Sequence, residues 1–196
     1  MKKLLVASHN INKIKEFKSL LNNQQIEIVS LKDLNEFDDV IEDGLSFFEN
    51  AYLKASYFAK KHKMITVSDD SGIVIEALDG KPGIYSARYS GKGDHENNLL
   101  VLREMIDKKN RSAYFISSVV LCYPNGEYKS YEGRVYGIIH DHMEGTNGFG
   151  YDSIFYYPPF NKTLAEVSLH DKNQVSHRAK ALQCLKEDID EILNYK

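Results

Sequence analysis

The sequence predicts a mixed α/β protein in which strands and helices alternate along a single chain of 196 residues. Short apolar runs of strand length recur between segments whose apolar residues repeat every three or four positions, the periodicity of an amphipathic helix. The dipeptide Asn125-Gly126 separates two β-rich runs, 113–122 and 128–139, and is a strong hairpin signal. This combination is typical of a mixed sheet covered by helices.

Length and composition narrow the class of protein. The chain can bury one substantial core, and we expect a single domain over residues 1–196. Apolar residues make up 42% and charged residues 27%, which is ordinary for a globular protein. The net charge of −3 gives no general attraction to nucleic acids or anionic membranes, so an anionic ligand would need a local cluster of Lys and Arg.

The expected compartment is the cytoplasm. Polar residues from His9 onward interrupt the N-terminal apolar run, which argues against a secretory signal. No apolar run approaches the ~18 residues that a membrane-spanning helix needs. Cys122 and Cys184 lack metal-binding spacing, and we expect both to be free thiols.

The first part of the chain predicts two strands and two helices. Residues 4–7 and 26–29 are short apolar runs typical of strands, and a helical pattern begins at Ile11. The acidic segment 32–44 predicts a loop, and a second helix with a wide apolar face begins at about Ser46.

The segment Ser68–Gly72 lies between two further apolar runs and contains adjacent carboxylates, Asp69 and Asp70. One interpretation is a turn, because Asp, Ser and Gly are favoured there. The other is a site for a hard cation such as magnesium, which carboxylate oxygens bind well. Spacing does not rank the two carboxylates, because neighbours on a strand point to opposite faces whereas neighbours in a turn can converge.

The second part of the chain predicts an ordered loop, the hairpin, a glycine-rich loop and two more helices. In order, these are a turn at 80–83, an ordered loop at 84–91, a helix at 95–108, the hairpin, a loop at 145–152, a strand at 154–157 and a last helix at 176–193. In the loop at 145–152, glycines permit close backbone approach and two aromatic rings could stack on a base. The alternative is a turn covered by core aromatics.

Several basic residues stand where a helix dipole disfavours them. Lys13 lies in the first turn of its helix, and His177 and Arg178 lie at the start of the last one. This placement favours binding of an anion, although a solvated surface lysine is an equally open explanation for Lys13. The pair His140-x-His142 could chelate a metal, but a surface pair is the commoner explanation.

Six blocks of sequence, in order, resemble the motifs of the Ham1/RdgB family of inosine triphosphate pyrophosphatases. They span most of the chain and are Ser8–Glu16, Phe48–Ala55, Ser68–Gly72, Pro82–Gly91, Gly148–Asp152 and Ser176–Arg178. The resemblance implies a two-lobed mixed α/β fold around a long curved mixed sheet, an active site in the cleft between the lobes, and a homodimer. It also implies Mg²⁺-dependent hydrolysis of ITP, dITP and XTP to the monophosphate and pyrophosphate, which cleanses the nucleotide pool.

The resemblance assigns roles residue by residue. Asp70 would be the general base and a metal ligand, with Glu42 as a second ligand, and Ser71 would contact substrate. The residues that would hold the triphosphate are Ser8, His9, Asn10, Ile11, Asn12, Lys13 and Lys54. Those that would recognise the base and its surroundings are Phe149, Gly150, Tyr151, Asp152, Lys172, His177 and Arg178. No stable nucleic-acid or membrane partner is implied.

Departures from the family pattern are few, and two alternative functions remain. Ile41 replaces the acid expected before Glu42, and the segment 169–171 departs from the usual acidic run before Lys172. His9 and Ser68 stand where glycine and alanine are usual. One alternative is a Maf-like pyrophosphatase acting on pyrimidine or modified nucleotides; the other is a catalytically silent nucleotide-binding or RNA-binding module.

Overall fold

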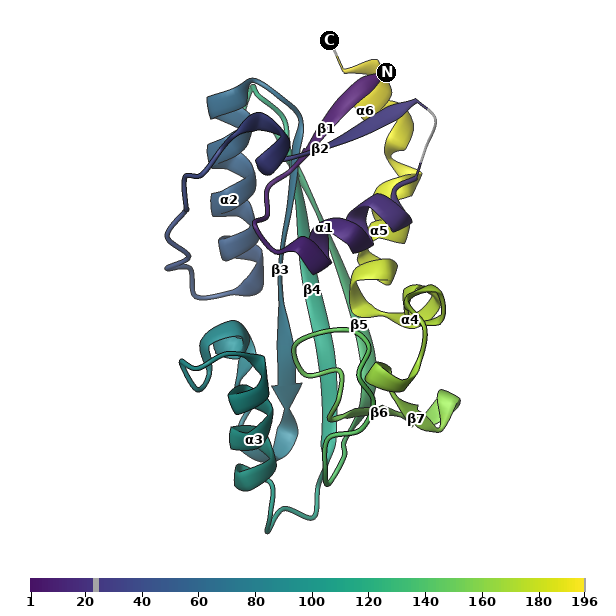
Figure 1. Ribbon diagram of the computed structural model, residues 1–196. Helices are drawn as coiled ribbons and strands as arrows, with labels where there is room; N and C mark the ends of the chain where they lie inside the picture. Colours follow the sequence, from purple (N-terminus) through teal and green to yellow (C-terminus); the bar gives the residue numbers. More distant parts are fainter. Residues whose placement is uncertain (23–24, 196) are drawn as a thin grey trace. The chain divides into compact units, whose positions relative to one another are not determined.

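The computed structural model describes residues 1–22 and 25–195, within which seven strands pair in one sheet (Figure 1). The strand order is β2-β1-β3-β4-β5-β6-β7. Strand β1 pairs in parallel with β2 and β3, whereas β6 pairs antiparallel with β5 and β7. The predicted mixed sheet is therefore confirmed.

The elements follow the predicted order. The strands are β1 Lys2–Val6, β2 Ile26–Ser30, β3 Thr66–Ile75, β4 Ser112–Cys122, β5 Tyr128–Ile139, β6 Phe155–Tyr157 and β7 Lys162–Thr163. The α-helices are α1 Ile11–Leu20, α2 Phe47–His62, α3 Asp94–Glu104, α4 Leu169–Val175, α5 His177–Glu187 and α6 Ile189–Asn194. None of the described helices is long and apolar enough to cross a membrane.

The chain divides into two compact units, as the two-lobed prediction requires. The first unit comprises Met1–Asp70, Ser117–Gly133 and Arg178–Lys196, and the second comprises Ser71–Ile116 and Arg134–His177. Strands β3, β4 and β5 contribute residues to both units.

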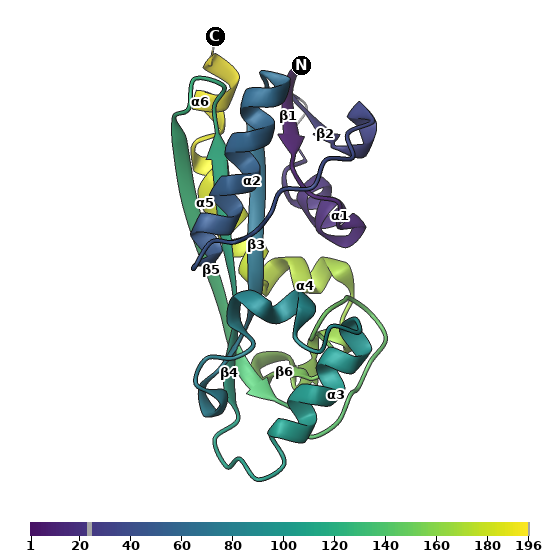
Figure 2. The same cartoon turned by 90° about the vertical axis from the view of Figure 1, so that its left-hand side faces the viewer.

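In the first unit, helices cover both faces of the sheet because the side chains of each strand alternate between faces. Leu4 and Val6 of β1 pack in one cluster with Phe17 of α1 and Leu182 of α5. Leu5 and Ala7 pack in another with Phe58 of α2. Helix α2 therefore lies on one side of β3, and α1 and α5 lie on the other (Figures 1 and 2).

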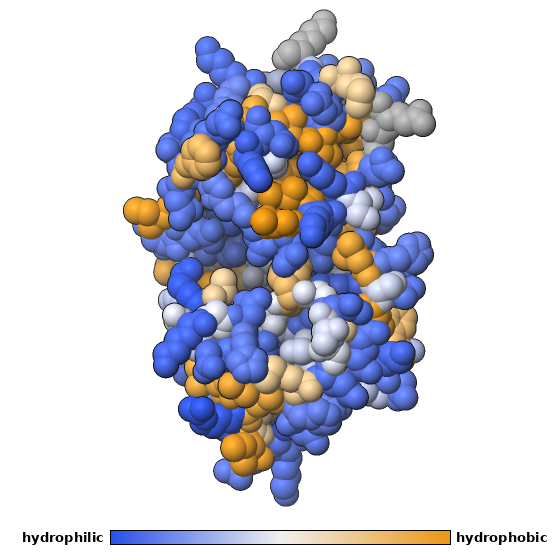
Figure 3. Space-filling model, viewed as in Figure 1, coloured by the Kyte–Doolittle hydropathy of each residue, from blue (hydrophilic) through white to orange (hydrophobic). Residues whose placement is uncertain are grey.

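The core of the second unit joins its strands to α3. Buried side chains of β3, β4, β5 and β6 form one cluster with Val101 of α3 and with Met105, which follows that helix. On the face seen in Figure 3, hydrophobic side chains reach the surface in separate patches among hydrophilic ones. Both cysteines are free thiols, with Cys122 buried and Cys184 exposed.

The turn expected at Ser68–Gly72 is wrong, because these residues lie inside the continuous strand β3. Asp favours turns when its carboxylate bonds nearby backbone groups. Here the carboxylates of Asp69 and Asp70 instead bond side chains from distant elements, Arg178 and Asn50. Tertiary contacts therefore override the local turn preference.

Two predicted helices have different bounds. The helix expected at 95–108 ends at Glu104; Met105 still packs in the core, but Ile106 and the residues up to 110 are exposed and give a longer helix no apolar face to bury. The last helix is divided into α5 and α6 at Asp188, whose carboxylate accepts a hydrogen bond from Tyr131 of β5 at 2.7 Å. A separate short helix, α4, precedes them and carries Lys172.

Candidate active site

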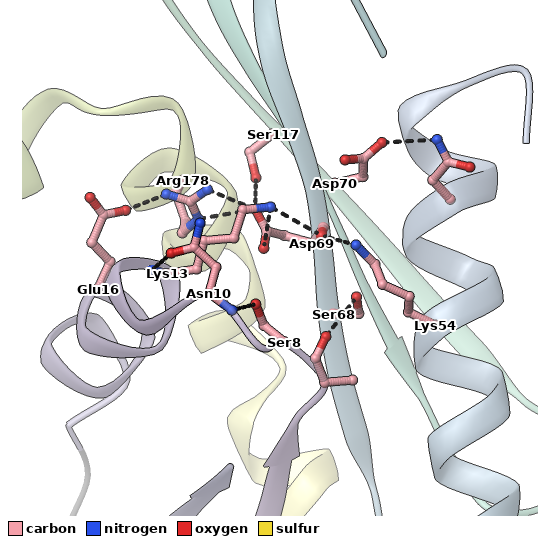
Figure 4. A network of polar contacts seen from close by, with 12 residues as sticks. Ser8, Asn10, Lys13, Glu16, Lys54, Ser68, Asp69, Asp70, Ser117 and Arg178 are labelled. Carbon is pink, nitrogen blue, oxygen red and sulfur yellow. Dashed lines mark hydrogen bonds and ion pairs between the residues drawn. The ribbon is translucent and has the colours of Figure 1, made fainter. Parts of the chain in front are cut away.

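Strand β3 places Asp69 and Asp70 on opposite faces of the sheet in the first unit, as alternation on a strand requires (Figure 4). The Asp69 side chain points toward α1 and α5, and the Asp70 side chain points toward α2 (Figure 4). The structure thereby distinguishes two carboxylates that spacing alone leaves equivalent.

Asp69 is the centre of a buried ion-pair network. Arg178 donates to its Oδ2 from Nη2 at 2.8 Å and from Nε at 3.1 Å, and Lys13 Nζ lies 3.2 Å from its Oδ1. The same guanidinium also pairs with Glu16 of α1. The side chains of Asp69, Glu16 and Arg178 are each 2% exposed or less, so water screens these charges weakly.

The network keeps Asp69 ionised. Burial alone would raise the pKa of this carboxyl, but Arg178, Lys13 and Lys54 outweigh that effect and hold the pKa well below its usual range. Asp69 and Glu16 in turn hold the pKa of the Arg178 guanidinium above its ordinary value, although its burial opposes this. A carboxylate that is paired with several cations and has so low a pKa is suited to stabilise the structure and is a poor proton acceptor.

Asp70 has the opposite electrostatic character. Its Oδ2 accepts a hydrogen bond from Asn50 Nδ2 of α2 at 3.1 Å. Burial raises its pKa above the ordinary value, and the nearby Glu42 carboxylate adds to this, whereas Lys13, Lys54 and the bond from Asn50 oppose it. Asp70 therefore takes up a proton more readily than an ordinary Asp, which suits a general base.

Two lysines approach the same backbone carbonyl between these carboxylates. Lys54 Nζ of α2 donates to Asp69 O at 3.0 Å, and Lys13 Nζ of α1 donates to it at 3.5 Å. Lys54 also pairs with Glu42 Oε1 at 2.9 Å. Burial lowers the pKa of Lys13, and the nearby Lys54 and Arg178 lower it further, against the attraction of Asp69 and Asp70. Additional anionic groups would relieve this crowding of cations.

Local sequence sets the direction of these side chains. Asn50 and Lys54 are four residues apart on α2, so both reach the same side of that helix. The helix begins after Ser46, whose hydroxyl accepts a hydrogen bond from Glu49 N at 3.2 Å. Asn10 caps α1 in the same way, with its Oδ1 accepting from Asn12 N at 2.9 Å and Lys13 N at 3.2 Å.

The other residues expected to hold a triphosphate surround this start of α1. Ser8 Oγ accepts from Asn10 N, His9 Nε2 lies 2.9 Å from Asp38 O, and the Ile11 side chain is exposed. The segment 8–13 thus leads into the first turn of the ten-residue helix α1, where the helix dipole favours an anion. Ser71, on β3, is the first residue of the second unit.

In the second unit, the residues expected to recognise a base form a tightly bonded loop. Asp152 Oδ2 accepts from Phe149 N at 2.9 Å and from Lys172 Nζ at 2.6 Å. The Lys172 ammonium also lies 4.7 Å from the centre of the Phe149 ring. Gly150 N donates to Asp94 Oδ2 at 2.8 Å, and this loop lines a pocket with Asp94 and α3. The loop therefore offers a fixed aromatic ring beside a buried charge.

Two of the expected residues also serve packing. Tyr151 is buried in the core, and its hydroxyl donates to Ser86 O at 2.7 Å. The buried His177 ring stacks on Phe115, with ring centres 5.0 Å apart. Asn50 is a polar neighbour of Asp70 to which the sequence interpretation gave no role. The sequence signal for such a role is an Asn beside Ala51 on an apolar helix face, and in the structure Asn50 is buried.

The fold and this cluster together define a class: a mixed α/β protein with a buried carboxylate flanked by cations that suit a phosphate group. The model of the Ham1 family matches residues 4–188. The chain belongs to the Ham1 family.

Several proteins are similar to this chain in sequence or structure over nearly its whole length. A dITP/XTP pyrophosphatase of Desulfotalea psychrophila is 43% identical over 98% of this chain and 87% of that protein. One of Geobacter sulfurreducens is 42% identical over 96% of this chain and 97% of that protein. The structure of the Staphylococcus aureus Ham1 protein covers 97% of this chain and 99% of its own, with 38% identity and a TM-score of 0.87. A HAM1 protein from Coxiella burnetii gives a TM-score of 0.89 at 36% identity, over 97% of this chain and 100% of its own.

Proposed function

We propose that this protein hydrolyses the non-standard purine nucleoside triphosphates ITP, dITP and XTP to the monophosphate and pyrophosphate. Relatives about 40% identical over nearly the whole chain carry the name dITP/XTP pyrophosphatase. The observation in the structure that supports the chemistry best is the Asp70 carboxylate, which Asn50 of α2 holds at 3.1 Å next to the residue whose backbone carbonyl Lys13 and Lys54 approach. Removal of these nucleotides would keep them out of newly made DNA and RNA.

The triphosphate is assigned to the cations of the first unit. A nucleoside triphosphate carries about four negative charges, and a chain of net charge −3 must gather cations locally to hold them. Lys13 and Lys54 place two partly buried ammonium groups at one carbonyl, beside the N-terminus of α1. Phosphate oxygens would replace the contact between Lys54 and Glu42 and would relieve the repulsion between the two ammonium groups.

Asp70 is assigned the role of general base. Asn50 fixes one of its oxygens by a hydrogen bond, which orients the carboxylate. A carboxylate with a raised pKa accepts a proton from water more readily than an ordinary one, so Asp70 would orient and deprotonate the water that attacks the α-phosphate. Asp69, held by Arg178, would keep β3 and the lysines in place.

Asp70 and Glu42 suit a magnesium ion. Their oxygens are hard ligands, and the Glu42 carboxylate is among the groups that raise the pKa of Asp70, as expected for two like charges near each other. A dication would remove this repulsion. When bound, magnesium would neutralise charge on the phosphates.

The base is assigned to the loop of the second unit. The ring of Phe149 would stack on a purine, and Lys172, Asp152 and His177 of the same unit would lie beside it. Arg178, to which the resemblance also gave a role at the base, lies in the first unit and pairs with Asp69 and Glu16. Donors directed at O6 favour 6-oxo purines and reject adenine, whose 6-amino group is itself a donor. Guanine shares O6, so its exclusion requires a penalty on its 2-amino group.

We also propose a homodimer that works in the cytoplasm without a stable nucleic-acid or membrane partner. The two alternatives are disfavoured. The matched relatives are named for purine substrates, which argues against a Maf-like enzyme that acts on pyrimidine nucleotides. An ionised Asp69, a protonatable Asp70 and two lysines argue against a silent binding module.

Product analysis tests the proposed reaction. With ITP and Mg²⁺ we expect IMP and pyrophosphate in equal amounts, and no turnover once the metal is chelated. Formation of IDP and phosphate would contradict hydrolysis at the α-phosphate. For the metal, we expect Mg²⁺ alone to raise the melting temperature of the wild-type protein and to have a much smaller effect on Asp70→Asn. An equal shift in both proteins would remove Asp70 from the metal site.

A further inference from the structure

The segment His140–Glu144, which follows β5 in the second unit, brings together three metal-ligating side chains outside the candidate active site. One ligand atom each from His140, His142 and Glu144 lie within 4.8 Å of one another. The spacing of the two histidines alone is more often that of a surface pair. Glu144 is the additional ligand that the structure reveals.

His142 is oriented as a metal ligand would be. Its Nδ1 lies 2.6 Å from Asp141 Oδ1, and its Nε2 lies 3.8 Å from Glu144 Oε2. A proton on Nδ1, shared with Asp141, leaves the lone pair of Nε2 free to bind an ion, which is the usual arrangement of histidines that bind metals. Two bonds of about 2.1 Å each can bridge atoms about 4 Å apart, so an ion fits between Nε2 and Glu144 with little adjustment.

The backbone fixes both ends of this segment. His140 N donates to Ile154 O at 2.8 Å, and His140 O accepts from Arg111 Nη2 at 2.6 Å. Glu144 N donates to Ser153 O at 2.9 Å. The ring of His140 also packs edge-on against the ring of His142, with centres 4.3 Å apart. Ligands held in place before binding lose less conformational freedom when an ion arrives.

We propose that His140, His142 and Glu144 form a binding site for one transition-metal dication, with Asp141 orienting His142. Two imidazoles and one carboxylate suit Zn²⁺, Co²⁺, Ni²⁺ or Cu²⁺, whereas Mg²⁺ prefers oxygen ligands throughout. The carboxylates of Asp141 and Glu144 offset the charge of the ion. This site is therefore distinct in chemistry from the one assigned to Asp70 and Glu42.

Calorimetric titration of the full chain with ZnCl₂, in excess MgCl₂ to occupy carboxylate sites, tests the proposal. We expect the wild-type protein to bind Zn²⁺ at this site, and His142→Ala and Glu144→Gln each to weaken the binding roughly tenfold or more. Asp141→Asn should weaken it about tenfold, because loss of an orienting partner typically costs that much. His170→Ala, which removes an exposed histidine of α4, is the matched control and should bind as the wild type does.

These substitutions should leave the fold intact because the side chains that they replace lie at the surface. His142 is 61% exposed, so His142→Ala should fold, and its circular dichroism spectrum should match that of the wild type. Absence of Zn²⁺ binding by the wild type, or wild-type affinity in His142→Ala, would overturn the proposal.

Discussion

Asp69 and Asp70 are chemically identical side chains, and their surroundings give them different roles. Asp69 is surrounded by Arg178, Lys13 and Ser117, whereas Asp70 is near Glu42 and accepts a hydrogen bond from Asn50 of α2. One position along a strand reverses the face of the sheet, and with it the electrostatic environment. The pair therefore divides the tasks of holding the site together and accepting a proton.

Substitution of each residue by Asn separates these tasks. Asp69→Asn should lower the free energy of unfolding by about 3 kcal/mol, because it removes one of the two carboxylates, Asp69 and Glu16, with which the buried Arg178 pairs. Asp70→Asn should change it by less than about 1 kcal/mol, since Asn preserves the shape and an acceptor for Asn50. Urea unfolding measures both values.

The losses of turnover should have the reverse order, with the larger loss in Asp70→Asn. Asp70→Asn should abolish hydrolysis of ITP while ITP still binds, because a neutral amide cannot accept the proton of water. The control is Asn50→Ala, which disturbs the orientation of Asp70 and should lower turnover less. Near wild-type turnover by Asp70→Asn would transfer the role of the base to another carboxylate.

The low pKa of Asp69 also predicts a dependence of stability on pH. A carboxyl whose pKa is lower in the folded protein stabilises it fully above the ordinary value of 3.8, and this stabilisation is lost as the pH falls below that value. The difference in unfolding free energy between the wild type and Asp69→Asn should therefore shrink as acid is added below about pH 4. Unfolding measured in metal-free buffer at several pH values gives this difference, and one that stays constant with pH would contradict the assignment.

Among the elements, the loop 145–152 owes its conformation to one close approach, between Gly148 and Asp152. A Cβ on Gly148 would overlap the carboxylate of Asp152, and the residue has φ +74°, which disfavours other side chains. Gly148→Ala should displace Asp152 from Lys172, reduce stability and raise KM for ITP.

Gly126→Ala is the matched control for this change. Gly126, in the hairpin turn, also has a positive φ, but a Cβ there would meet no other atom within 4 Å. It should lose only the stability that the backbone conformation costs, about 1 kcal/mol, and keep its KM. Equal losses in the two variants, with no change in KM, would show that contact with Asp152 does not shape the loop.

The elements themselves were predictable where local signals agree with the fold. The helical periodicity that begins at Ile11 and at about Ser46, and the dipeptide Asn125-Gly126, each predicted an element that the structure confirms. Strand β3 was not predictable through Ser68–Gly72, because its turn-forming residues are held extended by partners far away in sequence. At Asp188, between α5 and α6, the carboxylate likewise bonds a residue far away in sequence, Tyr131 of β5.

For the whole molecule, motifs in order along the chain were the most informative signal. They predicted the family and the two-lobed mixed fold, which the family match and the structural neighbours confirm. Lys13, Lys54 and Asp70, to which the resemblance gives roles in the site, lie near one another in the first unit. The buried pair of Arg178 with Asp69 and Glu16 was not anticipated, because no local pattern links residues so far apart in the chain.

The central claim is that the protein selects non-standard purines, and steady-state pyrophosphate release tests it most directly. The measurement compares kcat/KM for ITP, XTP, GTP, ATP and dUTP in the presence of Mg²⁺. We predict that kcat/KM for ITP and for XTP exceeds that for GTP on the order of 100-fold, the discrimination that a single mismatched group of the base can give. ATP and dUTP should have still lower values of kcat/KM. Equal turnover of GTP and ITP would contradict the account.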